Sequence, residues 1–240
     1  MITIIAKQQD HRALNAQLRQ TERDCRLVDC CGQRFLAAGM ADRHISIEGV
    51  PGNALGAYLN GAEITVHGNA QDAVGDTMNE GLIVVHGNIG DAAGYAMRGG
   101  KLFVRGCAGY RAGIHMKAYK EKVPLMIIGG TAGSFLGEYQ AGGVIVVLGL
   151  GCETGRIVGN FPCTGMHGGK VFLRSDCADV HFPHQVDARP ANENDLQELK
   201  AYLPEFCTLF GYCAETILAS PFTVVTPQSN NPYRQMYVAN

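Results

Sequence analysis

Glycine recurs in this sequence at a spacing of 19 residues, and this spacing limits the possible fold more than any other feature. One row of glycines ends successive short apolar runs, a second row lies seven residues after the first, and a third row lies three residues after it. The first row contains Gly49, Gly68, Gly87, Gly106 and, after a five-residue excess, Gly130; the second contains Gly56, Gly75, Gly94, Gly113 and Gly137; and the third contains Gly52, Gly90, Gly109 and Gly133. Two units depart from the third row, with Gln71 and Cys152 at the glycine position.

The segments between the glycines are short, rich in branched residues and bounded by glycine, as in "AEITVHG", "LIVVHG" and "VIVVLG". This composition is typical of β-strands. A period of this length is too short for a repeat of two helices, but it suits a coil of short strands joined by tight turns. The sequence therefore predicts an all-β solenoid, a parallel β-helix whose coils stack about 4.8 Å apart.

Alternation within the strands indicates which side chains point inward. One row is apolar without exception and should line the interior. It runs Ile45/Ile47, Ile64/Val66, Ile83/Val85, Leu102/Val104, Met126/Ile128, Ile145/Val147 and Val171/Leu173. This row predicts about seven coils between residues 44 and 174, with the excess length at 114–124 and 153–168 extruded as loops. The glycines would then serve the corners, where the chain needs a positive φ or a close backbone approach.

The outward row begins polar and then becomes apolar, ending with Phe103, Ile127, Val146 and Phe172. An exposed apolar strip of this size is rare on a monomer, so we expect a cover. Two covers are possible. One is the protein's own C-terminal segment, and the other is a partner subunit, for which these four residues would form the docking surface.

The flanks lack the repeat and divide the chain into an N-terminal cap segment (1–43), the β-helix (44–175) and a C-terminal cap and tail (176–240). We expect a helix over "HRALNAQLRQ". A second capped helix over "NENDLQELKAYL" should stop at Pro204, and a third amphipathic helix should carry Phe206, Phe210, Cys213 and Ile217. The end, "PFTVVTPQSNNPYRQMYVAN", is expected to be extended. Caps of this kind protect the open ends of a solenoid.

Composition excludes several classes of partner. Charged residues make up 18% of the chain and the formal net charge is −2, which favours neither nucleic acid nor a membrane surface. No apolar run reaches membrane-spanning length. The nine cysteines include no C-x-x-C pair, so we expect reduced thiols and a cytoplasmic location.

Few residues are arranged for chemistry. The glycine units lack the Lys-Ser/Thr of a phosphate-binding loop. Glu48, His67 and His86 occupy one position on consecutive coils and could reach a zinc ion, but side chains in a straight row converge poorly, and an outward polar ladder is the favoured interpretation. Cys163 and His167 lie four residues apart in a glycine-rich loop without a supporting acid, and we interpret them as structural.

The coils, together with "GTAGSFLGEYQAGGVIVVLG" and "TGMHGGKVFLR", resemble the GXGXG domain. This domain forms the C-terminal region of the large subunit of glutamate synthase, and it is similar to the C subunit of formylmethanofuran dehydrogenase. The resemblance covers about residues 39–175, and the flanks look more like stand-alone members. It implies a right-handed β-helix with no catalytic residue of its own. In glutamate synthase the domain holds the glutaminase and flavin synthase domains in place so that ammonia can pass between them.

The resemblance suggests a non-catalytic scaffolding subunit of a split glutamate-synthase-like complex. It implies a glutaminase and an FMN-binding synthase as partners, with FMN and iron–sulfur clusters in the partner subunits and no cofactor bound by this chain. Two alternatives are a scaffold of a formylmethanofuran-dehydrogenase-like complex and an independent zinc-dependent enzyme that uses Glu48, His67 and His86. A homo-oligomer is compatible with each of these hypotheses.

Overall fold

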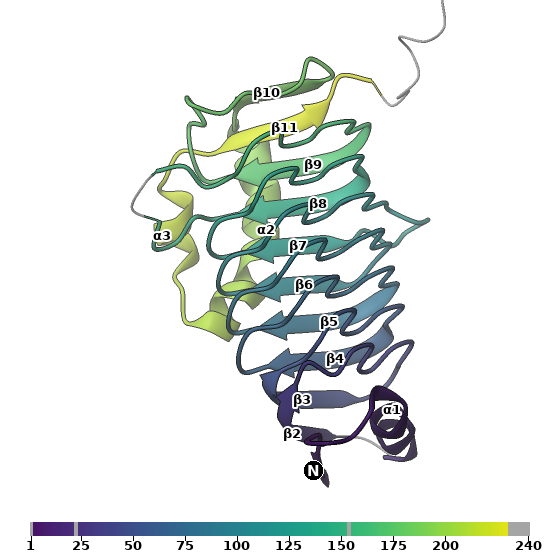
Figure 1. The fold of residues 1–240 in the computed structure, drawn as a ribbon. Helices are drawn as coiled ribbons and strands as arrows, with labels where there is room; N and C mark the ends of the chain where they lie inside the picture. The colour runs from purple at the N-terminus through teal and green to yellow at the C-terminus, as the bar shows by residue number, and fades with distance from the viewer. Residues whose placement is uncertain (1, 22–23, 153–154, 230–240) are drawn as a thin grey trace, which may run out of the picture.

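The computed structural model describes residues 2–21, 24–152 and 155–229, and the chain winds into a right-handed parallel β-helix (Figure 1). Nine strands follow one another in a single parallel ladder in chain order, and two further strands close the far end. The parallel strands are β1 (Ile2–Ile5), β2 (Cys25–Cys31), β3 (His44–Val50), β4 (Asn60–Val66), β5 (Glu80–Val85), β6 (Lys101–Val104), β7 (Leu125–Ile128), β8 (Ala141–Val147) and β9 (Gly168–Leu173). The closing strands are β11 (Thr223–Pro227), antiparallel to β9, and β10 (Val186–Pro190), antiparallel to β11.

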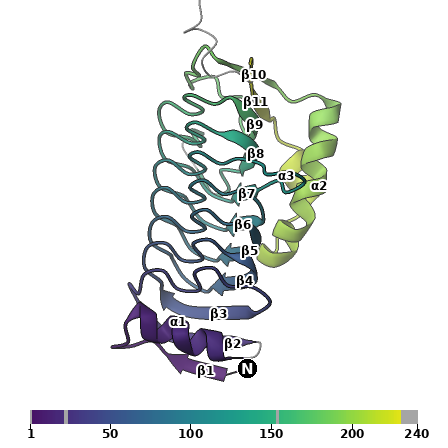
Figure 2. The same ribbon diagram turned by 90° about the vertical axis from the view of Figure 1, so that its right-hand side faces the viewer.

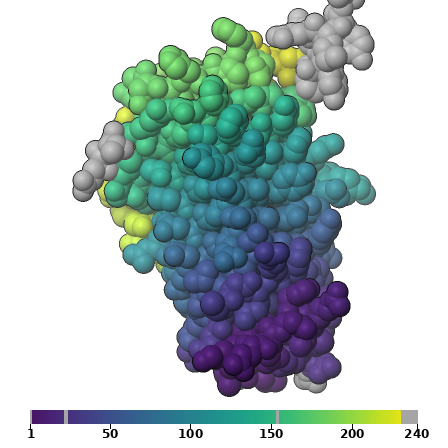
Figure 3. All heavy atoms as spheres, in the orientation of Figure 1, coloured from purple at the N-terminus to yellow at the C-terminus, as the bar shows by residue number. Residues whose placement is uncertain are grey.

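The register of the ladder confirms the predicted columns. Ile45 pairs with Ile64, and Ile64 pairs with Ile83, each partner one period of the repeat further along the chain. Leu102 pairs with Met126 across the predicted insertion. The inward residues of β3 to β9 are all buried in one continuous core. Colour bands follow the sequence order from one end of the column to the other in Figure 3, as stacking of consecutive coils requires.

The repeat begins one coil earlier than the sequence predicted. Strand β2 pairs with β3, and the loop after it places Leu36 and Met40 in the buried core. These two residues lie one period before Leu55 and Leu59. The coil was missed because it contains few glycines and non-glycine residues such as Phe35 occupy its left-handed corner positions. The predicted N-terminal helix is present as α1 (His11–Gln20), whose two leucines are buried in the same core.

The corner glycines serve the two purposes that the sequence suggested. Gly75 has φ +70°, a conformation that side chains rarely adopt. Gly133 passes so close to the preceding coil that a Cβ would lie 2.7 Å from the carbonyl carbon and oxygen of Gly109. The third glycine row therefore lets consecutive coils approach each other.

Replacing Gly133 with alanine should destabilise the protein more than replacing Gly39. At Gly39 (φ +68°) a Cβ would meet no atom within 4 Å, so Gly39→Ala should cost only the left-handed strain of about 1 kcal/mol. Gly133→Ala forces a Cβ into backbone, and we expect a loss of about 3 kcal/mol. Thermal unfolding of both variants measures the difference, and equal losses would contradict the close-approach role.

Two loops leave the column, and the second is shorter than predicted. The first contains an antiparallel bridge between Tyr119 and Lys122. The second lies between Gly149 and Ile157 rather than over 153–168, because Val158 already pairs with Ala132 of the preceding coil. Residues 153–154 lie outside the described part of the chain.

The shorter loop also corrects one member of the third glycine row. Gly159 fills the position that the sequence pattern gave to Cys152, since its added Cβ would meet Gly133 and Ser134 of the preceding coil. The glycine row therefore continues into the last coil, and Cys152 belongs to the loop.

The protein's own C-terminal segment covers the outward apolar row. Helix α2 (Glu193–Phe210) runs along the outer face of the sheet (Figure 2). A second hydrophobic core forms between sheet and helix. From the sheet it takes Val84, Phe103, Ile127, Val146 and Phe172, and from the helix Leu199, Leu203, Phe206 and Phe210. The predicted docking role of Phe103, Ile127, Val146 and Phe172 must be corrected, because all four are buried by α2 and offer no surface to a partner.

The helix does not stop at Pro204. Its exposed side carries the proline, while Leu203 and Phe206 on the buried side remain packed against the sheet. Burying these side chains offsets the single lost backbone hydrogen bond, so the helix continues to its C-cap at Gly211. The expected third helix is reduced to α3 (Ala214–Leu218). No helix in the described ranges is long and apolar enough to span a bilayer.

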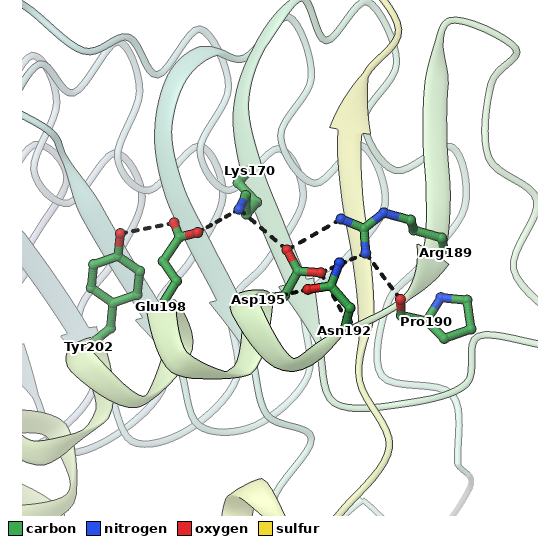
Figure 4. A network of polar contacts seen from close by, with 7 residues as sticks. All are labelled: Lys170, Arg189, Pro190, Asn192, Asp195, Glu198 and Tyr202. Atoms are coloured by element: carbon green, nitrogen blue, oxygen red, sulfur yellow. Dashed lines mark hydrogen bonds and ion pairs between the residues drawn. The ribbon is translucent and has the colours of Figure 1, made fainter.

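Charged contacts hold α2 near its start, as Figure 4 shows, and also near its other end. Near its start, Asp195 accepts hydrogen bonds from Arg189 at 2.6 Å and from the backbone of Asn192 at 3.0 Å, and Lys170 contacts Glu198 at 2.5 Å. The Arg189 guanidinium, more than any other group, lowers the pKa of Asp195. Near the other end of the helix, Lys101 pairs with Glu205.

Substituting Asp195 should loosen α2. The side chain is 5% exposed, completes the helix capping box and neutralises Arg189. Asp195→Ala should therefore cost about 2–3 kcal/mol of the free energy of unfolding. Glu205→Gln, at the exposed pair, is the control and should cost less than about 1 kcal/mol. Chemical denaturation compares them, and a smaller effect at Asp195 than at Glu205 would contradict the buried clamp.

Candidate functional site

The polar column considered for zinc is a ladder of pairwise contacts. Glu48 forms an ion pair with Arg26 of the first coil. His67 Nε2 lies 2.9 Å from the hydroxyl of Ser46, and its ring stacks on His86 with centroids 5.6 Å apart. Glu48 and His67 are thus engaged by side chains of the preceding coil, and the two imidazoles stack on each other.

His86 also contacts the last turn of α2. Its ring meets Phe210 edge to face, with centroids 5.2 Å apart. Burial, followed by the nearby His67 and Arg105, lowers the pKa of His86. The neutral ring therefore predominates at neutral pH and packs as an apolar surface against the helix. Among the described residues, no group of three or more His, Cys, Asp or Glu side chains is placed to hold a metal ion.

The Cys163 and His167 pair has no nucleophilic geometry. Cys163 is fully buried at a corner with φ +60°, and burial raises the pKa of its thiol to about 12. A thiol in this state is protonated at neutral pH and is a poor nucleophile. His167 Nδ1 lies 3.0 Å from the carbonyl oxygen of Gly165, so the imidazole is engaged by backbone.

A feature that sequence reasoning missed lies on the left-handed corners of the coils. Two columns of residues with positive φ run along this edge, and successive coils place large side chains in or beside them. We define the corner patch as Tyr95, Arg111, His115, Phe135, Tyr139 and Phe161. Backbone bonds hold the columns in step: Arg111 N donates to Ser134 O, and Phe135 N donates to Asn160 O.

The side chains of the corner patch contact one another across coils. The His115 ring stacks on Tyr139 with centroids 5.2 Å apart and meets Tyr95 edge to face at 5.9 Å. Phe135 stacks on Phe161 at 5.3 Å. The Arg111 guanidinium lies 4.9 Å from the centre of the Phe135 ring, and its Nε donates to Glu138 at 3.0 Å.

The corner patch is exposed although it is preorganised. Tyr139 is 45% and Phe161 60% exposed. Large residues are also not required by the corner, because Ala54, Ala73 and Ala92 occupy equivalent positions with φ +62°, +56° and +54°.

The strain of a positive φ comes from Cβ and is the same for those alanines, so the rings and the guanidinium beyond Cβ are not needed to turn the coil. The patch is therefore the best candidate for a functional surface. Two spacings in the sequence indicate the patch. His115 to Tyr139 and Phe135 to Phe161 each span one insertion, and both are longer than the period of the repeat.

Comparison with known proteins agrees with the repeat and the fold. The model of the GXGXG motif family matches residues 2–228, nearly all of the described chain. The chain belongs to the GXGXG motif family. This GXGXG protein is 41% identical over 250 residues to "Uncharacterized protein MJ1350" of Methanocaldococcus jannaschii, and the match covers 98% of this chain and 96% of that protein.

Among solved structures, this GXGXG protein is similar to a chain of the formyltransferase/hydrolase complex FhcABCD from Methylorubrum extorquens, determined in complex with methylofuran. The TM-score is 0.64 at 20% sequence identity, and the match covers 83% of this chain and 71% of that chain. At this identity the likeness shows the shared β-helical fold.

Proposed function

We propose that this GXGXG protein is a non-catalytic scaffolding subunit of a split glutamate-synthase-like complex. In this proposal it positions a glutaminase subunit and a synthase subunit that carries FMN and iron–sulfur clusters. The corner patch is the observation that carries a docking role. It is a preorganised, exposed aromatic surface with an arginine, and aromatic residues and arginine are enriched at the centres of protein interfaces.

The fold supports this role. A column of hydrogen-bonded coils is a rigid support, and α2 already covers the outward apolar row, so a partner must use another face. The match covers 96% of the relative from Methanocaldococcus jannaschii, so in that organism a protein of this kind occurs without a glutaminase or synthase domain in the same chain, which supports the proposal. The partners would supply the reacting groups, and the scaffold would fix the distance that ammonia travels between them.

A second assembly is a candidate because a solved structure of the same fold belongs to one. The FhcABCD structure is a complex of a formyltransferase and a hydrolase. By analogy, this chain would serve as the scaffold in a formylmethanofuran-dehydrogenase-like complex. The identity of the co-purifying subunits separates the two assemblies: an amidotransferase and a flavoprotein support the first, and a molybdenum or tungsten enzyme supports the second.

Removing two rings of the corner patch should release the partner without unfolding the scaffold. The double variant Tyr139→Ala/Phe161→Ala places alanine at left-handed positions that alanine already fills in other coils. We expect unchanged thermal stability and at least a tenfold loss of partner recovery, because two hot-spot side chains contribute about 2 kcal/mol or more to binding. Affinity purification with quantitative mass spectrometry from the native host measures recovery.

Phe35→Ala is the matched control, since Phe35 is exposed and occupies the same corner column four coils from Arg111. It should leave partner recovery unchanged. Equal recovery from the double variant and from the wild type would refute docking at the corner patch. Purification without any stoichiometric partner would contradict the scaffolding function itself.

A further inference from the structure

The two ends of the sheet differ in how their edges are protected. The far edge is strand β10, which carries Asp187, Arg189 and, as its last residue, Pro190. Charges and proline are the usual devices against pairing with another strand. The near edge is β1, with the sequence Ile-Thr-Ile-Ile and no charge or proline. One end of the column is thus closed to strand addition and the other is open.

The free edge of β1 presents a matched donor and acceptor at one residue. Ile2 N and Ala6 N donate to carbonyls on the β2 side, at Asp24 and Val28. Because successive residues alternate, the N–H and C=O of Thr3 point away from β2. The carbonyl of Ile5 also points away, but the side chain of Gln9 donates to it at 2.7 Å. Thr3 is therefore the centre of the open edge.

No described segment covers this edge. In the sheet order β1 is terminal. Figure 2 shows β1 at the lower margin of the column with α1 beside it, and α1 directs Leu14 and Leu18 into the interior. Ile2 and Ile5 are 56% and 57% exposed, a high value for isoleucine in a strand of a sheet.

We propose that two copies of this chain pair through β1, antiparallel and centred on Thr3, so that the sheets of both copies continue through one two-fold interface. A second copy is the favoured occupant because the edge is complementary to itself. Two Thr3 residues in a hydrogen-bonded antiparallel pair exchange both N–H···O bonds. The uncharged strands meet without repulsion, and each Ile2 lies opposite Ile4 of the other copy.

In this arrangement the interface between the copies continues the hydrophobic core of each copy. Ile4 is buried in the core of its own copy, and the opposing Ile2 stands on the same face of the sheet. The interface also lies at the end of the column, away from the corner patch. Pairing of copies and docking of partners are therefore independent, and either can fail without the other.

The oligomeric state of the purified full chain tests the pairing. Analytical ultracentrifugation of the wild type should show a dimer. Ile2→Lys, which sets a lysine against the other copy's isoleucine, should raise the dimer dissociation constant at least tenfold while the thermal unfolding midpoint stays unchanged. Asp187→Lys, an exposed change on the opposite edge strand, is the control and should remain dimeric. A wild type that stays monomeric up to its solubility limit, or a dimer unaffected by Ile2→Lys, would overturn the proposal.

A second measurement fixes the register even if Ile2→Lys folds poorly. In a hydrogen-bonded antiparallel pair the two Cα atoms at position 3 lie about 5.5 Å apart and both side chains stand on one face of the sheet, within reach of a short thiol-specific cross-linker. Thr3→Cys should therefore give a covalent dimer with such a cross-linker, with the cross-linked N-terminal peptides identified by mass spectrometry. Arg12→Cys, on the exposed side of α1, is the control and should not cross-link in this way. Absence of the position 3 cross-link in a sample treated with the cross-linker would refute the antiparallel register.

Discussion

Backbone hydrogen bonding from coil to coil is the interaction on which the rest of this structure depends. It fixes each residue above its counterpart in the preceding coil, so any side chain chosen at one position becomes part of a column. The polar turns show the effect clearly: Asn69 Oδ1 accepts from Asn88 N, and Asn88 Oδ1 accepts from Cys107 N, both at 2.8 Å. Columns of glycine, methionine and branched residues arise in the same way, and so do the aromatic columns at the corners.

Stacking of the coils also lines up the outward apolar side chains in one row, and α2 covers this row. A solenoid buries its inward row automatically, but its outward rows depend on their own composition. Where the outward row turns apolar, at Val84, a helix begins to cover it, and the cover extends to Phe172. Ion pairs at Lys170 and Lys101 hold the helix at both ends. The sheet is thereby sealed on one side, and exposed aromatic surface remains on the corners.

The sequence predicted the parts of the fold that repeat. The period of the glycine rows determined the strand positions and the inward row, and the leucine spacing of α1 was sufficient to locate that helix. The first coil was not predicted, because its corners contain residues such as Phe35 and Ala37, which adopt φ +54° and +59° in place of glycine. Local propensity also failed at Pro204, where burial of Leu203 and Phe206 outweighs one missing hydrogen bond.

The candidate docking surface was harder to predict than the fold. The inward and outward residues of a strand alternate with a period of two, and this pattern is visible within a single strand. The corner patch depends instead on which corner residues of different coils become neighbours, and two insertions shift that alignment after residues 116 and 149. Ring contacts such as His115 with Tyr139 therefore emerge only once the coils are stacked.

We expect α2 to cover the outward apolar row and a partner to cover the corner patch. Hydroxyl-radical footprinting of the native assembly tests both most directly, because it reports the exposure of each aromatic ring. In the isolated protein, Tyr139 and Phe161 should react readily, whereas Phe103 and Phe206 should be protected by α2 packing on the sheet. In the native assembly, Tyr139 and Phe161 should become protected while Phe103 and Phe206 stay protected. Continued reactivity of both corner rings in the assembly, or reactivity of Phe103 in the isolated protein, would contradict a sealed outer face and a docking corner.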